Sequence, residues 1–201
     1  MITYTILAFL IALFLGFAIV PVAMRVGVRA GLIDHPDRER KLHERAVPLI
    51  GGIAIFVTMM IALPLIAFLF PDVSVTGRKK LGLFLASLII LLVGIIDDRF
   101  AIRGRQKLLG QIAAATVLIY FDYRFEIISV FGQHFRNQMQ IVYIIVAYGW
   151  ILIGINSVNL LDGADGFATT IGIVTSAALC VMVFSLGHHQ DAIICAAMTG
   201  A

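Results

Sequence analysis

Residues 81–98 read "LGLFLASLIILLVGIIDD", and this run points to the fold of the chain. It carries no charge from Leu81 to Ile96 and then ends in two consecutive aspartates. A transmembrane helix needs about 20 predominantly apolar residues. We therefore expect this run, together with flanking residues, to cross a membrane as a helix whose acidic end lies at the membrane surface.

The rest of the chain has the same character. Of its 201 residues, 61% are hydrophobic and 13% are charged, whereas a soluble domain is nearer half apolar and a quarter charged. The apolar residues come in long blocks, which predicts an all-α fold: a polytopic transmembrane helix bundle with about six full spans and a truncated seventh, forming a single integral membrane domain over residues 1–201. The predicted spans cover residues 3–24, 49–70, 81–96, 108–121, 141–158 and 168–187, and the seventh begins near residue 192.

Basic residues predict the orientation of these spans. None precedes Arg25, so the first apolar block lacks the basic start of a signal peptide, and the N-terminus is expected outside the cytoplasm. The loops on one side hold ten Lys and Arg residues, against five on the other. Because cytoplasmic loops carry the excess of positive charge, the richer set is predicted to be cytoplasmic. The richer set comprises the loops at 25–48, 97–107 and 156–167, and the poorer set those at 71–80, 122–140 and 188–191.

The unusual polar residues gather on the predicted cytoplasmic side. The three segments read "GLIDHPDRERKLHERAVPLIGG" (31–52), "GIIDDRFAIRGRQKLLGQ" (94–111) and "NSVNLLDGADG" (156–166). In the last of them Asn156, Asn159, Asp162 and Asp165 recur at every third residue, and residues three apart lie on one side of a helix. Polar groups at membrane depth are costly when unpaired, and ionisable ones mark functional sites by default.

Some of these features also have a purely structural interpretation. Asp97 and Asp98 are compatible with an ordinary helix end at the membrane interface. The basic loop at 25–48 is compatible with attraction to anionic lipid. The two cysteines have neither metal-site nor disulfide spacing and are expected to be small buried hydrophobes.

Carboxylates, amides and cations meeting at a membrane surface favour one kind of chemistry. Carboxylate and carbonyl oxygens are hard ligands that suit Mg²⁺ or Mn²⁺, and Lys and Arg neutralise phosphate charge. Phosphoryl transfer needs both, because its catalysis is mostly positioning and charge stabilisation. A donor dissolved in the cytosol and an acceptor dissolved in the bilayer would meet at this surface. The residues therefore indicate metal-assisted phosphoryl transfer to a lipid.

The three segments, in this order, resemble the motifs of the bacterial polyprenyl-phosphate N-acetylhexosamine-1-phosphate transferases. The resemblance rests on "DHPDRERKLHERAVPLIGG", "GIIDDRF" followed by "KLLGQ", and "NSVNLLDGADGF". The first motif is more similar to that of the undecaprenyl-phosphate GlcNAc-1-phosphate transferases than to that of the muramoyl-pentapeptide branch. The chain resembles the N-terminal part of such an enzyme only.

The resemblance implies a reaction, a cofactor and a location. A UDP-N-acetylhexosamine, most simply UDP-GlcNAc, would give its sugar-1-phosphate to undecaprenyl phosphate and release UMP, which initiates cell-envelope polysaccharide synthesis. The cofactor would be Mg²⁺, with Mn²⁺ as the alternative. The enzyme would be a multi-pass protein of the bacterial inner (cytoplasmic) membrane with a cytoplasmic active face, would bind no nucleic acid, and could be a homodimer. A muramoyl-pentapeptide phosphotransferase-type enzyme and a membrane transporter remain the alternatives.

The resemblance also implies residue roles. Asp97 and Asp98 would act at the phosphates and Lys107 as a diphosphate clamp, which makes these three the catalytic candidates. Asn159 would be associated with the metal, for which the two aspartates are further candidate ligands. The substrate-binding candidates are Asn156, Asp162, Asp165, His43, Arg40 and Lys41.

Two departures from the family pattern affect these expectations. Ala101 stands where many members carry a third aspartate after the acidic pair. The family's downstream motifs, including an aspartate that serves as a metal ligand, are expected beyond residue 201. We therefore expect the chain to be inactive by itself and assign the activity to a longer protein.

The orientation can be tested by cysteine labelling. In a background with the native cysteines replaced, a cysteine introduced at Ala101 is expected to react only with thiol reagents that enter the cytoplasm. One introduced at Ser74 is expected to react from outside, because the excess of basic residues places it on the opposite side. The measurement is thiol labelling in intact and permeabilised cells, and the reverse pattern would contradict the predicted orientation.

Overall fold

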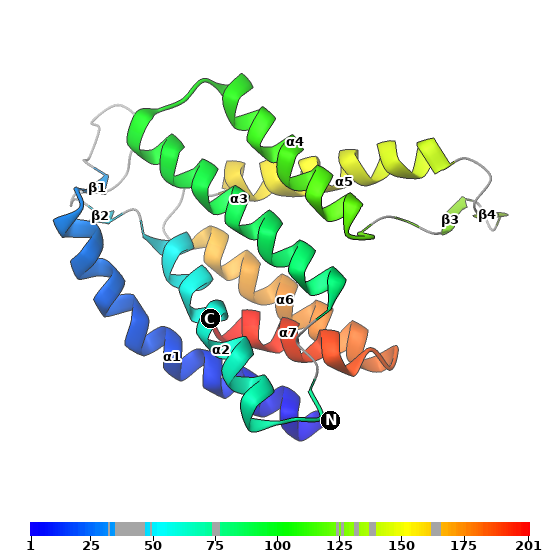
Figure 1. The fold of residues 1–201 in the computed structure, drawn as a ribbon, viewed down its shortest axis with the longest axis horizontal. Coiled ribbons are helices and arrows are strands. Elements are labelled where there is room, and N and C mark those ends of the chain that lie inside the picture. Colours follow the sequence, from blue (N-terminus) through cyan, green and yellow to red (C-terminus); the bar gives the residue numbers. More distant parts are fainter. Residues whose placement is uncertain are drawn as a thin grey trace. The chain divides into compact units, whose positions relative to one another are not determined.

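The structure is a computed structural model, and it is helical (Figure 1). It describes residues 1–31, 33–34, 47–48, 50–73, 77–123, 125, 127–130, 133–136, 140–161 and 166–201. Over these residues the helices are α1 (Ile2–Arg29), α2 (Gly51–Leu69), α3 (Arg78–Phe100), α4 (Gly104–Tyr120), α5 (Gln140–Leu161), α6 (Phe167–Ser185) and α7 (His189–Gly200). Five of them, α1, α2, α3, α5 and α6, are long and apolar enough to cross a membrane. The predicted all-α, polytopic helical membrane fold is thereby confirmed, with five candidate spans over the described residues in place of about six, and the helix at the predicted span 108–121 is not among them.

The helix lengths refine the predicted spans. Helix α3 has 23 residues because it begins at Arg78 and continues through the acidic pair to Phe100, so flanking residues do extend this short apolar block. Helix α4 has 17 residues, or about 26 Å at 1.5 Å per residue, and it carries Arg105 and Lys107 in its first turn. It is therefore shorter than the roughly 30 Å hydrocarbon core. Helix α7 has 12 residues.

Two short antiparallel hairpins lie between the helices. Strand β1 (Ile33–Asp34) pairs with β2 (Val47–Pro48), and β3 (Ile127–Val130) pairs with β4 (Gln133–Arg136). The sequence did not predict them, because strands of two to four residues are too short for a recognisable two-residue alternation.

The chain divides into two compact units, and the first consists of Met1–Val75 and Leu161–Ala201. In it α1 packs against both α2 and α7, and α6 packs against α7. The close approach of α1 and α7 depends on small residues: Ala8, Ala12 and Gly16 recur at every fourth position of α1 and are buried. A Cβ added to Gly200 of α7 would collide with the backbone of α1. Small residues are typical of helix interfaces in membranes because they let two backbones approach closely.

The second unit, Thr76–Leu160, is built on an antiparallel hairpin of α3 and α4. Two glycines bring its helices together, since an added Cβ at Gly110 would collide with Val93 and one at Gly82 with Phe121. Helix α5 meets α4 through the polar side chains described below. The single membrane domain over residues 1–201 stays a prediction.

Large apolar side chains are exposed on several helices. Phe14, Phe17, Phe68, Trp150 and Ile153 each expose about two-thirds or more of their surface. A protein surrounded by lipid does not need to bury such side chains, because the hydrocarbon of the bilayer is as apolar as they are.

The close approach of α3 and α4 leads to a prediction about the free energy of unfolding. Gly110→Ala is expected to lower the free energy of unfolding by about 1–3 kcal/mol, because a new methyl group overpacks the contact with Val93. The measurement is the thermal unfolding midpoint of the purified protein in detergent. Gly94→Ala is the matched control, since a Cβ there meets nothing within 4 Å and alanine is the better helix former. Equal losses in both variants would contradict the packing interpretation.

Candidate functional site

The site is built on the turn that connects α3 to α4. Helix α3 is closed by Ala101, whose backbone is left-handed (φ 46°, ψ 59°) and whose N–H donates to the carbonyl of Asp97 at 2.8 Å. This conformation is uncommon outside glycine and favours asparagine and aspartate among the other residues. An aspartate would therefore suit this backbone better than the alanine found here. The chain reverses direction between Phe100 and Gly104.

Helix α4 begins with a reciprocal contact. The Arg103 N–H donates to Gln106 Oε1 at 3.0 Å, and the Gln106 N–H donates to the Arg103 carbonyl at 2.8 Å. An arginine side chain has no acceptor atom with which to cap a helix, so the Gln106 side chain does the capping. The start of α4 is thereby defined, and Lys107 lies in its first turn.

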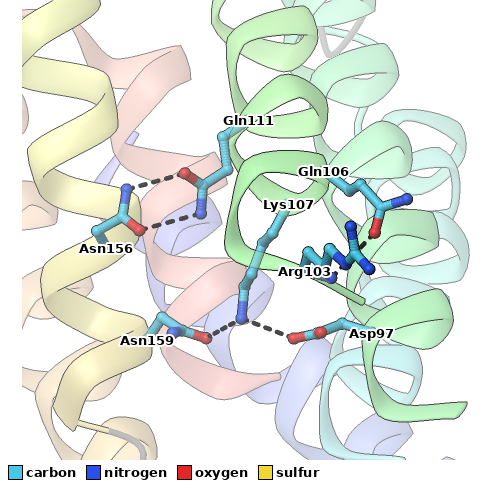
Figure 2. A network of polar contacts seen from close by, with 7 residues as sticks. All are labelled: Asp97, Arg103, Gln106, Lys107, Gln111, Asn156 and Asn159. Carbon is cyan, nitrogen blue, oxygen red and sulfur yellow. Dashed lines mark hydrogen bonds and ion pairs between the residues drawn. The ribbon is translucent and has the colours of Figure 1, made fainter. Parts of the chain in front are cut away.

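Lys107 lies at the centre of the site and joins three helices (Figure 2). Its Nζ donates to Asp97 Oδ2 on α3 at 2.8 Å and to Asn159 Oδ1 on α5 at 2.9 Å. The Lys107 and Asp97 side chains are 25% and 24% exposed, so the ion pair is partly shielded from solvent. The structure therefore brings together two of the three predicted catalytic residues and the predicted metal-associated asparagine.

The placement of these charges does not serve helix stability. Asp97 lies in the last turn of α3 and Lys107 in the first turn of α4. A helix dipole favours cations at its C-terminus and anions at its N-terminus, so each charge occupies the less favourable end of its helix. The ion pair offsets both placements, and such an arrangement is more consistent with a functional site than with ordinary surface charge.

A second polar contact lies one turn further along α4. Gln111 Nε2 donates to Asn156 Oδ1 at 3.2 Å, and Asn156 Nδ2 donates back to Gln111 Oε1 at 2.9 Å. Asn156 Nδ2 also donates to the Leu152 carbonyl at 2.8 Å. Gln111 is 2% exposed, and both polar atoms of its side chain are satisfied by this pair. The two asparagines, three residues apart on α5, thus both contact α4.

Of the remaining predicted site residues, the structure describes only Asp98. This residue is exposed in the last turn of α3. Five predicted residues lie outside those that the structure describes: Arg40, Lys41, His43, Asp162 and Asp165. Conversely, Gln111 had no predicted role. The signal that could have found it is a glutamine four residues after Lys107, within an otherwise apolar run.

The donor atoms of the site are compatible with a hard divalent cation. Asp97 Oδ2 and Asn159 Oδ1 both lie within hydrogen-bond distance of the Lys107 ammonium group, so two oxygens already converge on one cationic group. Oxygen donors of this kind suit Mg²⁺, which commonly takes one or two carboxylates together with substrate phosphates. Within the described part of the chain, no three His, Cys, Asp or Glu side chains form a metal cluster.

These observations define a helical membrane protein with a cation-bearing, oxygen-lined site at the ends of its helices. The profile of glycosyl transferase family 4 matches residues 80–201, and the chain belongs to this family. The match covers all three helices of the site, and it favours a transferase over a transporter.

Sequence identity to individual proteins supports this assignment. The chain is 26% identical to the probable undecaprenyl-phosphate N-acetylglucosaminyl 1-phosphate transferase of Bacillus subtilis, over 90% of the chain and 49% of that protein. It is 31% identical to the decaprenyl-phosphate N-acetylglucosaminephosphotransferase of Mycobacterium tuberculosis, over 87% and 43%. It is 27% identical to the undecaprenyl-phosphate alpha-N-acetylglucosaminyl 1-phosphate transferase of Escherichia coli K12, over 89% and 47%. The chain thus spans slightly under half the length of these relatives.

Proposed function

We propose that the protein to which this chain belongs transfers GlcNAc-1-phosphate from UDP-GlcNAc to undecaprenyl phosphate and releases UMP. The observation that carries the proposal is the Lys107 ammonium group held between the Asp97 carboxylate and the Asn159 amide oxygen. Membership in glycosyl transferase family 4 and the names of the relatives support it.

The reaction is a displacement at phosphorus. An oxygen of the lipid phosphate attacks the β-phosphorus of the UDP-sugar, and the bond from that phosphorus to the bridging oxygen breaks. UMP leaves with the bridging oxygen, and the lipid carries the new diphosphate-sugar. Both substrates are anionic, so the protein must supply positive charge where the phosphates meet.

Lys107 supplies that charge. In the structure its ammonium group is paired with Asp97 and Asn159, and phosphate oxygens are strong acceptors that compete for the same N–H groups. Lys107 can therefore exchange a carboxylate partner for a diphosphate without becoming unpaired. Asp97, released from Lys107, is then free to orient or accept a proton from the lipid phosphate.

A divalent cation fits the same donor set. Asp97, Asp98 and Asn159 are the described residues that would hold Mg²⁺. The ion would neutralise phosphate charge and keep the two anionic substrates together.

The reaction would take place at a membrane surface. We place the site at the cytoplasmic face of the bacterial inner membrane, with the N-terminus outside, because the basic residues are concentrated in the loops on that side. The product would initiate a cell-envelope polysaccharide.

The reaction has a direct assay. The full-length enzyme, supplied with UDP-GlcNAc, undecaprenyl phosphate and Mg²⁺, is expected to release UMP and to form lipid diphosphate-GlcNAc, and EDTA is expected to stop it. The measurement is chromatography of the nucleotide product and of radiolabelled lipid. Release of UDP would show transfer of the sugar without its phosphate and would refute the proposal. A muramoyl-pentapeptide branch enzyme would turn over only the UDP-muramoyl-pentapeptide donor.

Substitutions of the site residues are expected to lower turnover in the same assay. Asp97→Asn, Asp98→Asn and Asn159→Ala are each expected to lower turnover by roughly a hundredfold or more, the scale of losing a main charge-stabilising group. Lys107→Ala is expected to lower turnover and also to raise the KM for UDP-GlcNAc, because a phosphate contact is lost.

The control for these variants is Asp122→Asn. Asp122 follows the C-terminal end of α4, at the opposite end of the α3–α4 hairpin, where it lies 3.9 Å from Arg78 Nε. It is expected to change turnover little. If Asp97→Asn and Asn159→Ala turn over at wild-type rates with normal expression, the polar residues of the site are structural.

A further inference from the structure

We propose that Gln111 is a positioning residue: its amide pair with Asn156 sets the register of α4 against α5 and thereby holds Lys107 against Asn159. This inference rests on the proposed function for its catalytic consequence, although the register itself is a property of the helices. It also gives Asn156 a different role from the substrate contact predicted from the sequence.

The Gln111–Asn156 pair belongs to a series of contacts between two helices. Polar pairs join α4 to α5, and those named next are here called the α4–α5 seam. The seam consists of Lys107–Asn159, Gln111–Asn156 and Thr116–Tyr148. Residue numbers rise along α4 while those of their partners fall along α5, so the helices run antiparallel. Along α4 the amide pair lies between Lys107 and the Thr116–Tyr148 contact, one turn from Lys107.

The Gln111 side chain is buried. It is 2% exposed, and a buried amide without hydrogen-bond partners is destabilising. Its hydrogen bonds are made with Asn156, a residue of another helix 45 positions away. The burial cost is therefore compensated only when α5 is in the observed position.

The pair consists of two opposed hydrogen bonds between the same two side chains. Each amide donates one hydrogen bond and accepts one, at 3.2 and 2.9 Å. A single hydrogen bond tolerates rotation and sliding of two helices, whereas two opposed bonds between planar amides form together in only one register. Because Gln111 is four residues from Lys107 and Asn156 is three from Asn159, this register also aligns the lysine with the asparagine.

Positioning by Gln111 has a kinetic consequence. Displacing a catalytic group by about 1 Å can cost a hundredfold in rate, so breaking the pair is expected to lower turnover without removing any group that touches substrate. Gln111→Leu keeps the side-chain volume near its original value and removes both hydrogen bonds. Asn156→Ala breaks the same pair from its exposed side and serves where Gln111→Leu fails to fold.

Turnover of the full-length enzyme tests this consequence. Each single variant is expected to lower turnover about tenfold or more, and the exchange Gln111→Asn with Asn156→Gln is expected to recover much of the loss because it rebuilds two opposed amides. In a Lys107→Ala background the effect of Gln111→Leu is expected to shrink to about twofold or less, since residues acting through one another are not additive. Thr116→Val removes the Thr116–Tyr148 contact of the seam. This variant is the matched control and is expected to keep near wild-type turnover.

A second measurement does not depend on activity. With the native cysteines replaced, cysteines at Lys107 and Asn159 are expected to be joined by a short bifunctional thiol reagent, since the two native side chains meet at 2.9 Å. Gln111→Leu or Asn156→Ala is expected to lower the crosslinked yield severalfold, the amide exchange to restore it, and Thr116→Val to leave it unchanged.

The two measurements separate the two proposals. Unchanged crosslinking in the amide variants overturns the positioning role, whatever the enzyme's reaction. An equal loss of turnover with and without Lys107 also overturns it, because a purely structural role is additive. If the wild-type enzyme releases no UMP while the amide variants lose crosslinking, the register role holds and the proposed function fails.

Discussion

A polar side chain that is shielded from water must make its hydrogen bonds within the protein. In the second unit this requirement acts on α3, α4 and α5 together. The Lys107 amine is satisfied by Asp97 and Asn159, and the Gln111 amide is satisfied by Asn156. The same contacts that relieve the cost of polar groups therefore also determine how the helices of the site are arranged. Architecture and candidate chemistry depend on one set of hydrogen bonds.

Small residues bring helices together in both units. Lipid is as apolar as leucine, so helices in a membrane gain little from burying large hydrophobes and rely on close contact at small residues. Gly82 and Gly110 allow that contact between α3 and α4, and Gly16 and Gly200 allow it between α1 and α7. In the second unit the close approach also brings the last turn of α3 beside the first turn of α4. The acidic and basic members of the site meet there across a short turn.

The charges of the site are placed for exchange of partners. Asp97 and Lys107 each occupy the helix end that its dipole disfavours, and their pairing offsets this. In the proposed reaction, a diphosphate arriving at Lys107 would replace one anionic partner with another, and the oxygens of Asp97 and Asn159 would become available to a divalent cation. Such an arrangement accords with the transferase family to which the chain belongs.

The helical membrane fold follows from the sequence alone, because uninterrupted apolar blocks of this length satisfy a bilayer only as helices. The sequence also places Asn156 and Asn159 on one side of a helix, and its ordered motifs identify the family. The pairing of Lys107 with Asp97 and Asn159, and the contact between Gln111 and Asn156, depend on the tertiary structure. Helical periodicity is local: it shows which residues share a face, but not which helix lies opposite. Contacts between residues 45 and 52 positions apart depend on how α4 and α5 pack, and the short strands depend on pairing that their own few residues do not reveal.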